Sequence, residues 1–241
     1  MNSSKKIARI VGTLFIIGTL AGILSVVFTS PILSDPEYLL KISENENLII
    51  MGAIFVLIMG FALAMVPVMM FPILKKQNES LALGYVVFRG ALETVTYIVI
   101  AINMLLLIPL SQEYVKAGVL DASYLQTFGA LLQGVAHLPM TVFVFSLGAL
   151  IFYTLLYQSK LIPRWLAVWG LIAITLHLAT GFLIIFGLQT DFSSSNTAMN
   201  FPIFLQEMVM AVWLIVKGFN PSLITSMSAK TNENKLAGAH S

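Results

Sequence analysis

Long hydrophobic runs, separated by short polar segments, occupy most of the chain. A membrane-spanning helix needs about 20 mostly apolar residues, because the hydrocarbon layer is about 30 Å thick and a helix rises about 1.5 Å per residue. Six runs meet or approach this length, and only the third and the sixth contain charged residues. The pattern therefore predicts six transmembrane helices, at residues 10–32, 48–73, 81–108, 126–157, 165–188 and 201–218.

Composition narrows the class of protein further. Of the 241 residues, 58% are hydrophobic and 10% are charged, whereas roughly a quarter of the residues are charged in a soluble domain. The net charge of +2 is small and scattered, so no basic face for nucleic acid is expected. The chain has no cysteine, which excludes disulfides, thiolate metal sites and iron–sulfur clusters. We therefore expect an all-α integral membrane bundle with the lipid bilayer as its main partner.

Basic residues are divided unevenly between the two sets of connecting segments. Only Lys41 and Lys116 fall in the set that contains most of the acidic residues. Positively charged loops stay on the cytoplasmic side, so we predict that both termini are cytoplasmic. Residues 1–221 then form one six-span domain, and the polar segment 222–241 is predicted to be a disordered cytoplasmic tail. The other set holds ten basic residues: Lys5, Lys6, Arg9, Lys75, Lys76, Lys160, Arg164, Lys217, Lys230 and Lys235.

Four stretches carry a resemblance to a known family. They are Arg9-Ile-Val-Gly-Thr-Leu14, Phe88-Arg-Gly-Ala-Leu-Glu93, Leu155-Leu-Tyr-Gln-Ser-Lys-Leu-Ile-Pro-Arg-Trp-Leu166, and Glu207 with Trp213-Leu-Ile-Val-Lys-Gly218. In these the chain resembles bacterial domain-of-unknown-function family 4386 over nearly all of residues 5–221. The resemblance implies a multi-pass protein of the bacterial cell membrane, and it carries over no established activity.

Ionisable side chains within the runs are the main candidates for a site, because burying them in lipid is costly unless they pair or line a cavity. At about 1.5 Å per residue from the cytoplasmic ends, Arg89, Glu93, His177 and Glu207 lie about 12–18 Å deep. We expect them to form one polar layer if their helices are neighbours. Arg89 can bridge Glu93 and Glu207, since a guanidinium can serve two carboxylates.

This predicted layer has two interpretations. In the structural one, the charges clip the third helix to the sixth and are fully satisfied inside the bundle. In the functional one, Glu93 or Glu207 is the titrating acid of a proton- or ion-responsive site, and His177 is its relay partner, because imidazole titrates near neutral pH. The three charged side chains sum formally to −1, so one proton makes the layer neutral.

A metal centre is the sharper alternative for the same residues. His177, Glu207 and Glu93, with His137, offer nitrogen and carboxylate ligands that suit zinc or iron. However, the chain has no His-Glu-x-x-His motif, and Arg89 competes with a cation for the carboxylates. Haem held by His137 and His177 is a weaker alternative, because His137 is predicted to lie about 30 Å from the cytoplasmic end. No cofactor is therefore expected.

Further polar residues lie within or beside the runs. Gln133 is one turn from His137, Asn103 lies deep in the third run, and Gln206 adjoins Glu207. We expect each to make an interhelical hydrogen bond, and together they can form one polar wall of an outward-facing pocket. Pro139 follows His137 closely and is expected to kink or unwind the fourth helix, because proline lacks a backbone donor.

Three hypotheses for function follow. The first is a membrane module that binds or passes a small or lipophilic molecule through the polar layer. The second is an intramembrane enzyme or metalloprotein in which His177, Glu93 and Glu207 supply acid–base groups or ligands. The third is a structural membrane subunit. The chain has no Gly-x-Gly-x-x-Gly fingerprint and no phosphate-binding loop, which argues against nucleotide chemistry. The sequence does not indicate an oligomeric state.

Overall fold

The computed structural model describes residues 3–117, 123–136, 139–190 and 193–221, and these residues contain helices and no strand. A continuous helix of 39 residues, Glu79–Ala117, consists of α4, the π-helix η1 and α5. The elements in chain order are α1 (Ser3–Leu33), α2 (Tyr38–Glu44), α3 (Glu46–Leu74), α4 (Glu79–Tyr85), η1 (Val86–Leu92), α5 (Glu93–Ala117), α6 (Ser123–Ala136), α7 (Met140–Ser159), α8 (Arg164–Ile185) and α9 (Ser194–Val216).

Six helices of the described chain are long and apolar enough to cross a membrane. They are α1, α3, the helix formed by α4, η1 and α5, then α7, α8 and α9. Large hydrophobic side chains point outward from them: Val27 and Ile172 are each 60% exposed, and Phe61 is 55% exposed. Such an outer surface is stable in lipid, whereas water would penalise it. The predicted all-α membrane bundle of six helices is confirmed.

The contacts between the six long helices close a ring in chain order. α1 packs on α3, and α3 packs on α5; η1 and α4 pack on α7, α7 on α8, α8 on α9, and α9 closes the ring on α1. The third and the sixth helices therefore face each other across the ring. This order places side chains from η1, α5 and α9 near the middle of the bundle.

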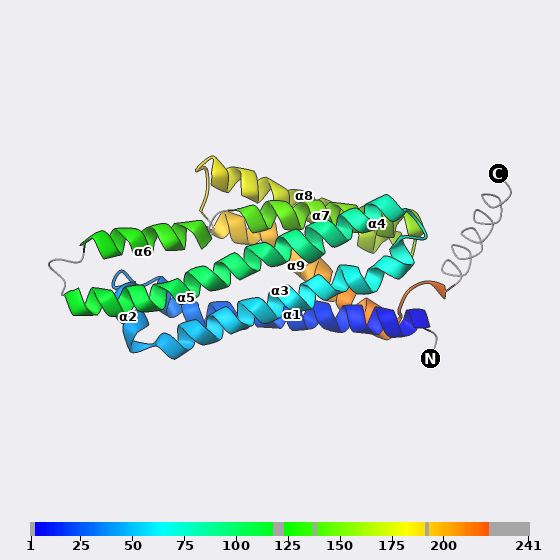
Figure 1. Ribbon diagram of the computed structural model, residues 1–241. Helices are drawn as coiled ribbons and strands as arrows, with labels where there is room; N and C mark the ends of the chain where they lie inside the picture. Colours follow the sequence, from blue (N-terminus) through cyan, green and yellow to red (C-terminus); the bar gives the residue numbers. More distant parts are fainter. Residues whose placement is uncertain (1–2, 118–122, 137–138, 191–192, 222–241) are drawn as a thin grey trace, which may run out of the picture.

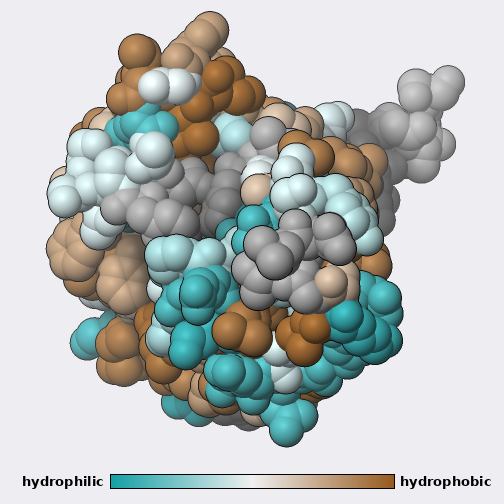
Figure 2. Space-filling view, turned by 90° about the vertical axis from the view of Figure 1, so that its left-hand side faces the viewer, coloured by the Kyte–Doolittle hydropathy of each residue, from teal (hydrophilic) through white to brown (hydrophobic). Residues whose placement is uncertain are grey.

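The two ends of the bundle differ in charge. The end that carries the start of α1, which we call the basic end, also holds the last described residues after α9 (Figure 1). Figure 2 looks onto the opposite end, which we call the acidic end. Hydrophilic residues gather in the lower part of this view, and Figure 1 shows α2 in that part of the bundle. The described acidic residues of that end are Asp35, Glu37, Glu44, Glu46 and Glu113, and the described basic residues of the other are Lys5, Lys6, Arg9, Lys75, Lys76, Lys160, Arg164 and Lys217.

The fourth predicted helix differs from the structure. In place of one helix at residues 126–157, the structure has α6, which ends at Ala136, and α7, which begins at Met140 after Pro139. The 14 residues of α6 extend only about 21 Å, whereas the 20 residues of α7 extend about 30 Å. Of these two helices, α7 is therefore the one that is long enough to span the membrane. The amphipathic α6 packs instead along α5. The last helix also starts earlier than predicted, because the Ser193 side chain accepts a hydrogen bond from the Asn196 backbone N–H and caps it.

Small residues permit close approach between neighbouring helices. Gly18 and Gly22 of α1 face Leu63 and Met59 of α3, so this pair packs inside the bundle. Gly12 approaches α9 most closely: a Cβ atom there would lie 2.5 Å from the backbone oxygen of Ala211. A helix backbone cannot move aside as a flexible side chain can, so the contact requires glycine.

Replacing Gly12 with alanine is expected to lower the free energy of unfolding by about 1–3 kcal/mol, the usual cost of overpacking. The matched control is Gly134→Ala on α6, where a Cβ atom would have no neighbour within 4 Å among the described residues. Alanine also favours helix by up to about 1 kcal/mol over glycine, so Gly134→Ala should unfold at the same or a higher temperature. Thermal unfolding of both variants in detergent checks this, and equal losses would contradict the requirement for glycine at the α1–α9 contact.

Candidate functional site

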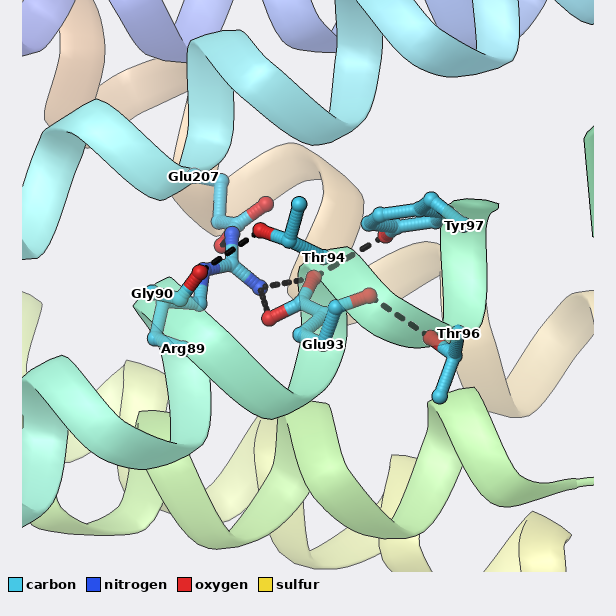
Figure 3. Close-up of polar contacts among 7 residues, drawn as sticks. All are labelled: Arg89, Gly90, Glu93, Thr94, Thr96, Tyr97 and Glu207. Carbon is cyan, nitrogen blue, oxygen red and sulfur yellow. Dashed lines mark hydrogen bonds and ion pairs between the residues drawn. The ribbon is translucent and has the colours of Figure 1, made fainter. Parts of the chain in front are cut away.

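Three charged side chains meet in the middle of the ring, and we call them the ion cluster: Arg89, Glu93 and Glu207. Arg89 Nη1 donates to both carboxylate oxygens of Glu93, at 3.0 and 3.1 Å, and Nη2 donates to Glu207 Oε1 at 3.2 Å (Figure 3). Arg89 is 3% exposed, Glu93 1% and Glu207 15%. The predicted bridge from the third helix to the sixth is therefore present.

The π-helix η1 carries Arg89 to this position. Its backbone N–H groups bond five residues back, and the Glu93 N–H closes the segment by donating to the Phe88 oxygen. π-Helical turns are rare and are frequent at functional sites. Gly148 of α7 lies against this turn, where a Cβ atom would be 3.1 Å from the Arg89 backbone nitrogen. The close approach of α7 thus supports the widened turn from behind.

Neighbouring side chains complete the surroundings of the ion cluster. The Tyr97 hydroxyl donates to Glu93 Oε1 at 2.9 Å, one turn along α5 (Figure 3). The Arg89 guanidinium carbon lies 4.3 Å from the centre of the Phe145 ring and 6.0 Å from that of Phe15. Aromatic faces attract a guanidinium. The contact of Tyr97 is predictable from its spacing of four residues from Glu93, whereas Phe145 and Phe15 come from other helices and carry no such signal.

His177 binds a partner outside the ion cluster. Its Nδ1 atom lies 2.7 Å from Asn200 Oδ1, and the Thr180 hydroxyl donates to the His177 backbone oxygen. The imidazole meets Phe145 edge-on, with ring centres 5.1 Å apart. Arg89 and His177 therefore share the Phe145 ring but make no direct hydrogen bond within the described residues. The hydrophobic pattern places Asn200 in a loop, so it gives no signal for this pairing.

The Gln206 side chain is hydrogen-bonded to two other helices where α7, α8 and α9 meet. Its Oε1 accepts from the Tyr153 hydroxyl at 2.6 Å, and its Nε2 donates to the Leu166 backbone oxygen at 3.0 Å. Both Gln206 and Tyr153 are 0% exposed. Gln206 thus makes the interhelical hydrogen bonds that the sequence predicted, and both polar atoms of its amide have a partner within the protein.

Asn103 and Gln133 both line a cavity away from the ion cluster, which we call the amide cavity. It has a volume of about 480 Å³ and lies between α1, α3, α5 and α6. The Asn103 Nδ2 and Gln133 Nε2 atoms are buried, and neither has a hydrogen-bond partner among the residues that the structure describes. Val26 also lines the cavity and is 58% exposed, so the cavity reaches the surface of the bundle. Gln206, predicted to share this wall, does not line the cavity, and His137 lies outside the described residues.

Four hydroxyl side chains also line the amide cavity, those of Ser25, Thr29, Ser30 and Ser34. The Ser25 hydroxyl donates to the Gly52 oxygen at 2.9 Å, and the Thr29 hydroxyl donates to the Ser25 oxygen at 2.9 Å. None of the described residues that line the cavity carries a charge. The two amide groups are the buried donors of the cavity that have no partner among the described residues, and the rest of its wall consists of apolar and hydroxyl side chains.

A metal centre gains no geometric support. Within residues 3–117, 123–136, 139–190 and 193–221, no group of three His, Asp or Glu side chains can hold a metal ion. Glu93 and Glu207 direct oxygens at Arg89, and His177 pairs with Asn200. The predicted set of His137, His177 and Glu207 includes one residue outside the described chain.

Comparison with known proteins gives one match. No curated protein and no solved structure is similar to the chain at a significant level. The family described as Domain of unknown function (DUF4386) matches residues 10–218, which cover the ring of helices, the ion cluster and the amide cavity. The chain therefore belongs to the DUF4386 family of multi-helix membrane proteins.

Proposed function

We propose that the protein binds a small, neutral, lipophilic molecule in the amide cavity, through a hydrogen-bond acceptor such as a carbonyl oxygen. The observation that carries this proposal is the pair of buried amide donors at Asn103 and Gln133, which have no partner among the described residues. Leaving a buried donor unsatisfied costs about 1–3 kcal/mol, so a ligand acceptor placed between them relieves a cost that the ligand-free protein bears.

The size and lining of the cavity support a ligand of this class. A volume of about 480 Å³ falls within the range of about 300–1,000 Å³ that is usual for small-molecule sites. An apolar wall with a few convergent polar groups is typical of such sites. A charged ligand would find no opposite charge among the described lining residues, which makes a neutral molecule the better match.

The ion cluster does not line the amide cavity, but it positions one wall of it. Glu93 and Tyr97 stand on the same helix as Ile100 and Asn103, which line the cavity. The buried apolar residues of the bundle form two clusters, one that includes Phe152 and one that includes Met104, and Tyr97 and Met59 pack against both. We infer that the cluster fixes the rotation of α5, and with it the direction of the Asn103 amide.

The proposed setting is the bacterial cell membrane, with both termini in the cytoplasm. The uneven distribution of lysine and arginine between the two ends of the bundle supports this orientation. The amide cavity lies in the half nearer the acidic end, and the ligand would therefore enter from the outer leaflet or the outer surface.

A fluorescent ketone tests the proposal. The probe is 6-acetyl-2-dimethylaminonaphthalene, whose emission responds to apolar surroundings and to hydrogen bonds at its carbonyl. We expect saturable binding to the purified protein, weakened at least fivefold by Asn103→Leu or Gln133→Leu, since one hydrogen bond contributes about 1 kcal/mol. The measurement is a titration in detergent at constant micelle concentration.

The matched control is Gln158→Leu, the same exchange at an exposed position of α7 outside the cavity. This variant should bind the probe as the unmodified protein does. Equal binding by all four proteins would mean that the probe only enters micelles, and the proposal would then fail.

A further inference from the structure

Two hollows on the basic end of the bundle meet at Trp213 and Lys217. The first has a volume of about 490 Å³ and lies between the α7–α8 connection and the residues after α9. The second has a volume of about 430 Å³ and runs along α9 itself. Both are lined by Trp213 and Lys217, so the two hollows adjoin. We call the first the polar hollow, because basic side chains line it, and the second the apolar hollow.

The polar hollow is a built feature of the fold. The Asn220 backbone N–H donates to the Leu161 oxygen at 3.0 Å and ties the two segments together. Leu161, Ile162 and Phe219 bury their side chains beneath it, with exposures of 0%, 2% and 6%. Lys160 ends α7 in the left-handed conformation, with φ of 55°. The backbone around the hollow is thus fixed by packing and hydrogen bonding.

The charge of this hollow has one sign. Lys160, Arg164 and Lys217 line it, and none of its described lining residues is acidic. The guanidinium carbon of Arg164 also lies 5.2 Å from the centre of the Tyr157 ring near the end of α7. Basic pockets between transmembrane helices recognise the phosphate of anionic lipids.

The second hollow suits a hydrocarbon chain. Apart from Lys217 and Trp213 its wall consists of Met208, Val209, Val212 and Val216. Val212 and Val216 are 55% and 61% exposed, so this wall faces outward from the ring. Tryptophan is enriched at the boundary between headgroups and acyl chains, and Trp213 lies where the two hollows join.

We propose that the two hollows together bind one anionic phospholipid. The phosphate group lies among Lys160, Arg164 and Lys217, and one acyl chain follows α9 past Trp213 toward the middle of the membrane. Free phosphate satisfies only the polar hollow, and a zwitterionic lipid leaves part of the positive charge uncompensated. The adjacent polar and apolar hollows therefore favour an intact anionic lipid.

Native mass spectrometry of the purified protein tests this lipid site. Dioleoyl phosphatidylglycerol and dioleoyl phosphatidylcholine, which have identical chains, are added at equal concentrations. We expect retention of one phosphatidylglycerol with at least tenfold preference. The variant Lys160→Gln/Arg164→Gln/Lys217→Gln should lose this preference by about 10- to 100-fold, because each cation near an anionic lipid contributes a factor of about five.

The control variant Lys6→Gln/Lys75→Gln/Lys76→Gln removes the same charge from the same end of the bundle but from outside the hollow. It should keep the preference for phosphatidylglycerol. Equal retention of both lipids, or an equal loss in the two variants, would overturn the proposal. So would competition by millimolar inorganic phosphate that is as effective as phosphatidylglycerol, since the acyl-chain hollow would then contribute nothing.

Discussion

Replacing Arg89 with methionine is expected to lower the free energy of unfolding by about 3–5 kcal/mol, the largest effect of any single substitution considered. The change leaves Glu93 and Glu207 facing each other in the middle of the ring without a cation. Removing one partner of a buried ion pair is strongly destabilising, because the charge that remains is uncompensated. Unfolding in mixed micelles with increasing denaturing detergent provides the measurement.

Two companion variants separate this charge effect from lost packing. Glu207→Gln leaves the neutral pair of Arg89 and Glu93, so we expect a loss below about 1.5 kcal/mol. The variant Arg89→Met/Glu93→Leu/Glu207→Leu, with Tyr97→Phe to remove the hydroxyl that would lose its acceptor, should recover most of the stability. If Arg89→Met alone costs less than about 1 kcal/mol, Arg89 does not compensate the buried charges of Glu93 and Glu207, and the description of the ion cluster is wrong.

The second large effect is expected at Gln206, where leucine should lower the free energy of unfolding by about 2–4 kcal/mol. The substitution removes the acceptor of the Tyr153 hydroxyl and the donor to Leu166, both in a site without solvent access. Each buried polar group left without a partner costs about 1–3 kcal/mol. Thermal unfolding monitored by tryptophan fluorescence gives the measurement, and adding Tyr153→Phe should restore part of the loss.

Asn103→Leu is the matched comparison and should act in the opposite direction. The Asn103 side chain has the same branched shape as leucine, but its buried Nδ2 atom has no partner among the described residues. Leucine removes that unsatisfied donor, so the ligand-free protein should be equally stable or about 1 kcal/mol more stable. If Asn103→Leu costs as much as Gln206→Leu, the Asn103 amide has a structural partner and the amide cavity loses its main support.

The sequence predicts the bundle and the ion cluster for physical reasons. Lipid requires long apolar helices, and their lengths follow from the hydrophobic runs. Apart from Lys217 at the end of the sixth run, Arg89, Glu93 and Glu207 are the charged residues within those runs, so they have to satisfy one another. The spacing of four residues between Arg89 and Glu93 indicates the first contact, and the guanidinium fork indicates the second.

Other features depend on the order and rotation of the helices, which hydrophobicity does not encode. The depth of His177 along α8 places it in the polar layer, but its hydrogen bond to Asn200 depends on which way the helix is turned. The separation of α6 from α7 at Pro139 moves Gln133 onto a helix that packs along α5. Pro139 indicates a break in the fourth helix, but no local pattern indicates that α6 then packs along α5 and lines the amide cavity.

The most direct test of ligand binding in the amide cavity compares the fluorescent ketone with its analogue in which a methylene group replaces the carbonyl. The quantity is the ratio of the two dissociation constants, measured for the unmodified protein and for Asn103→Leu/Gln133→Leu. Micelle partitioning and apolar contacts cancel between the two proteins, so a change in this ratio reports the hydrogen bonds to the carbonyl. We predict that the preference for the ketone is about 25- to 30-fold greater in the unmodified protein, in line with two hydrogen bonds of about 1 kcal/mol each. The same ratio in both proteins would contradict the proposal that these two amides hold the ligand.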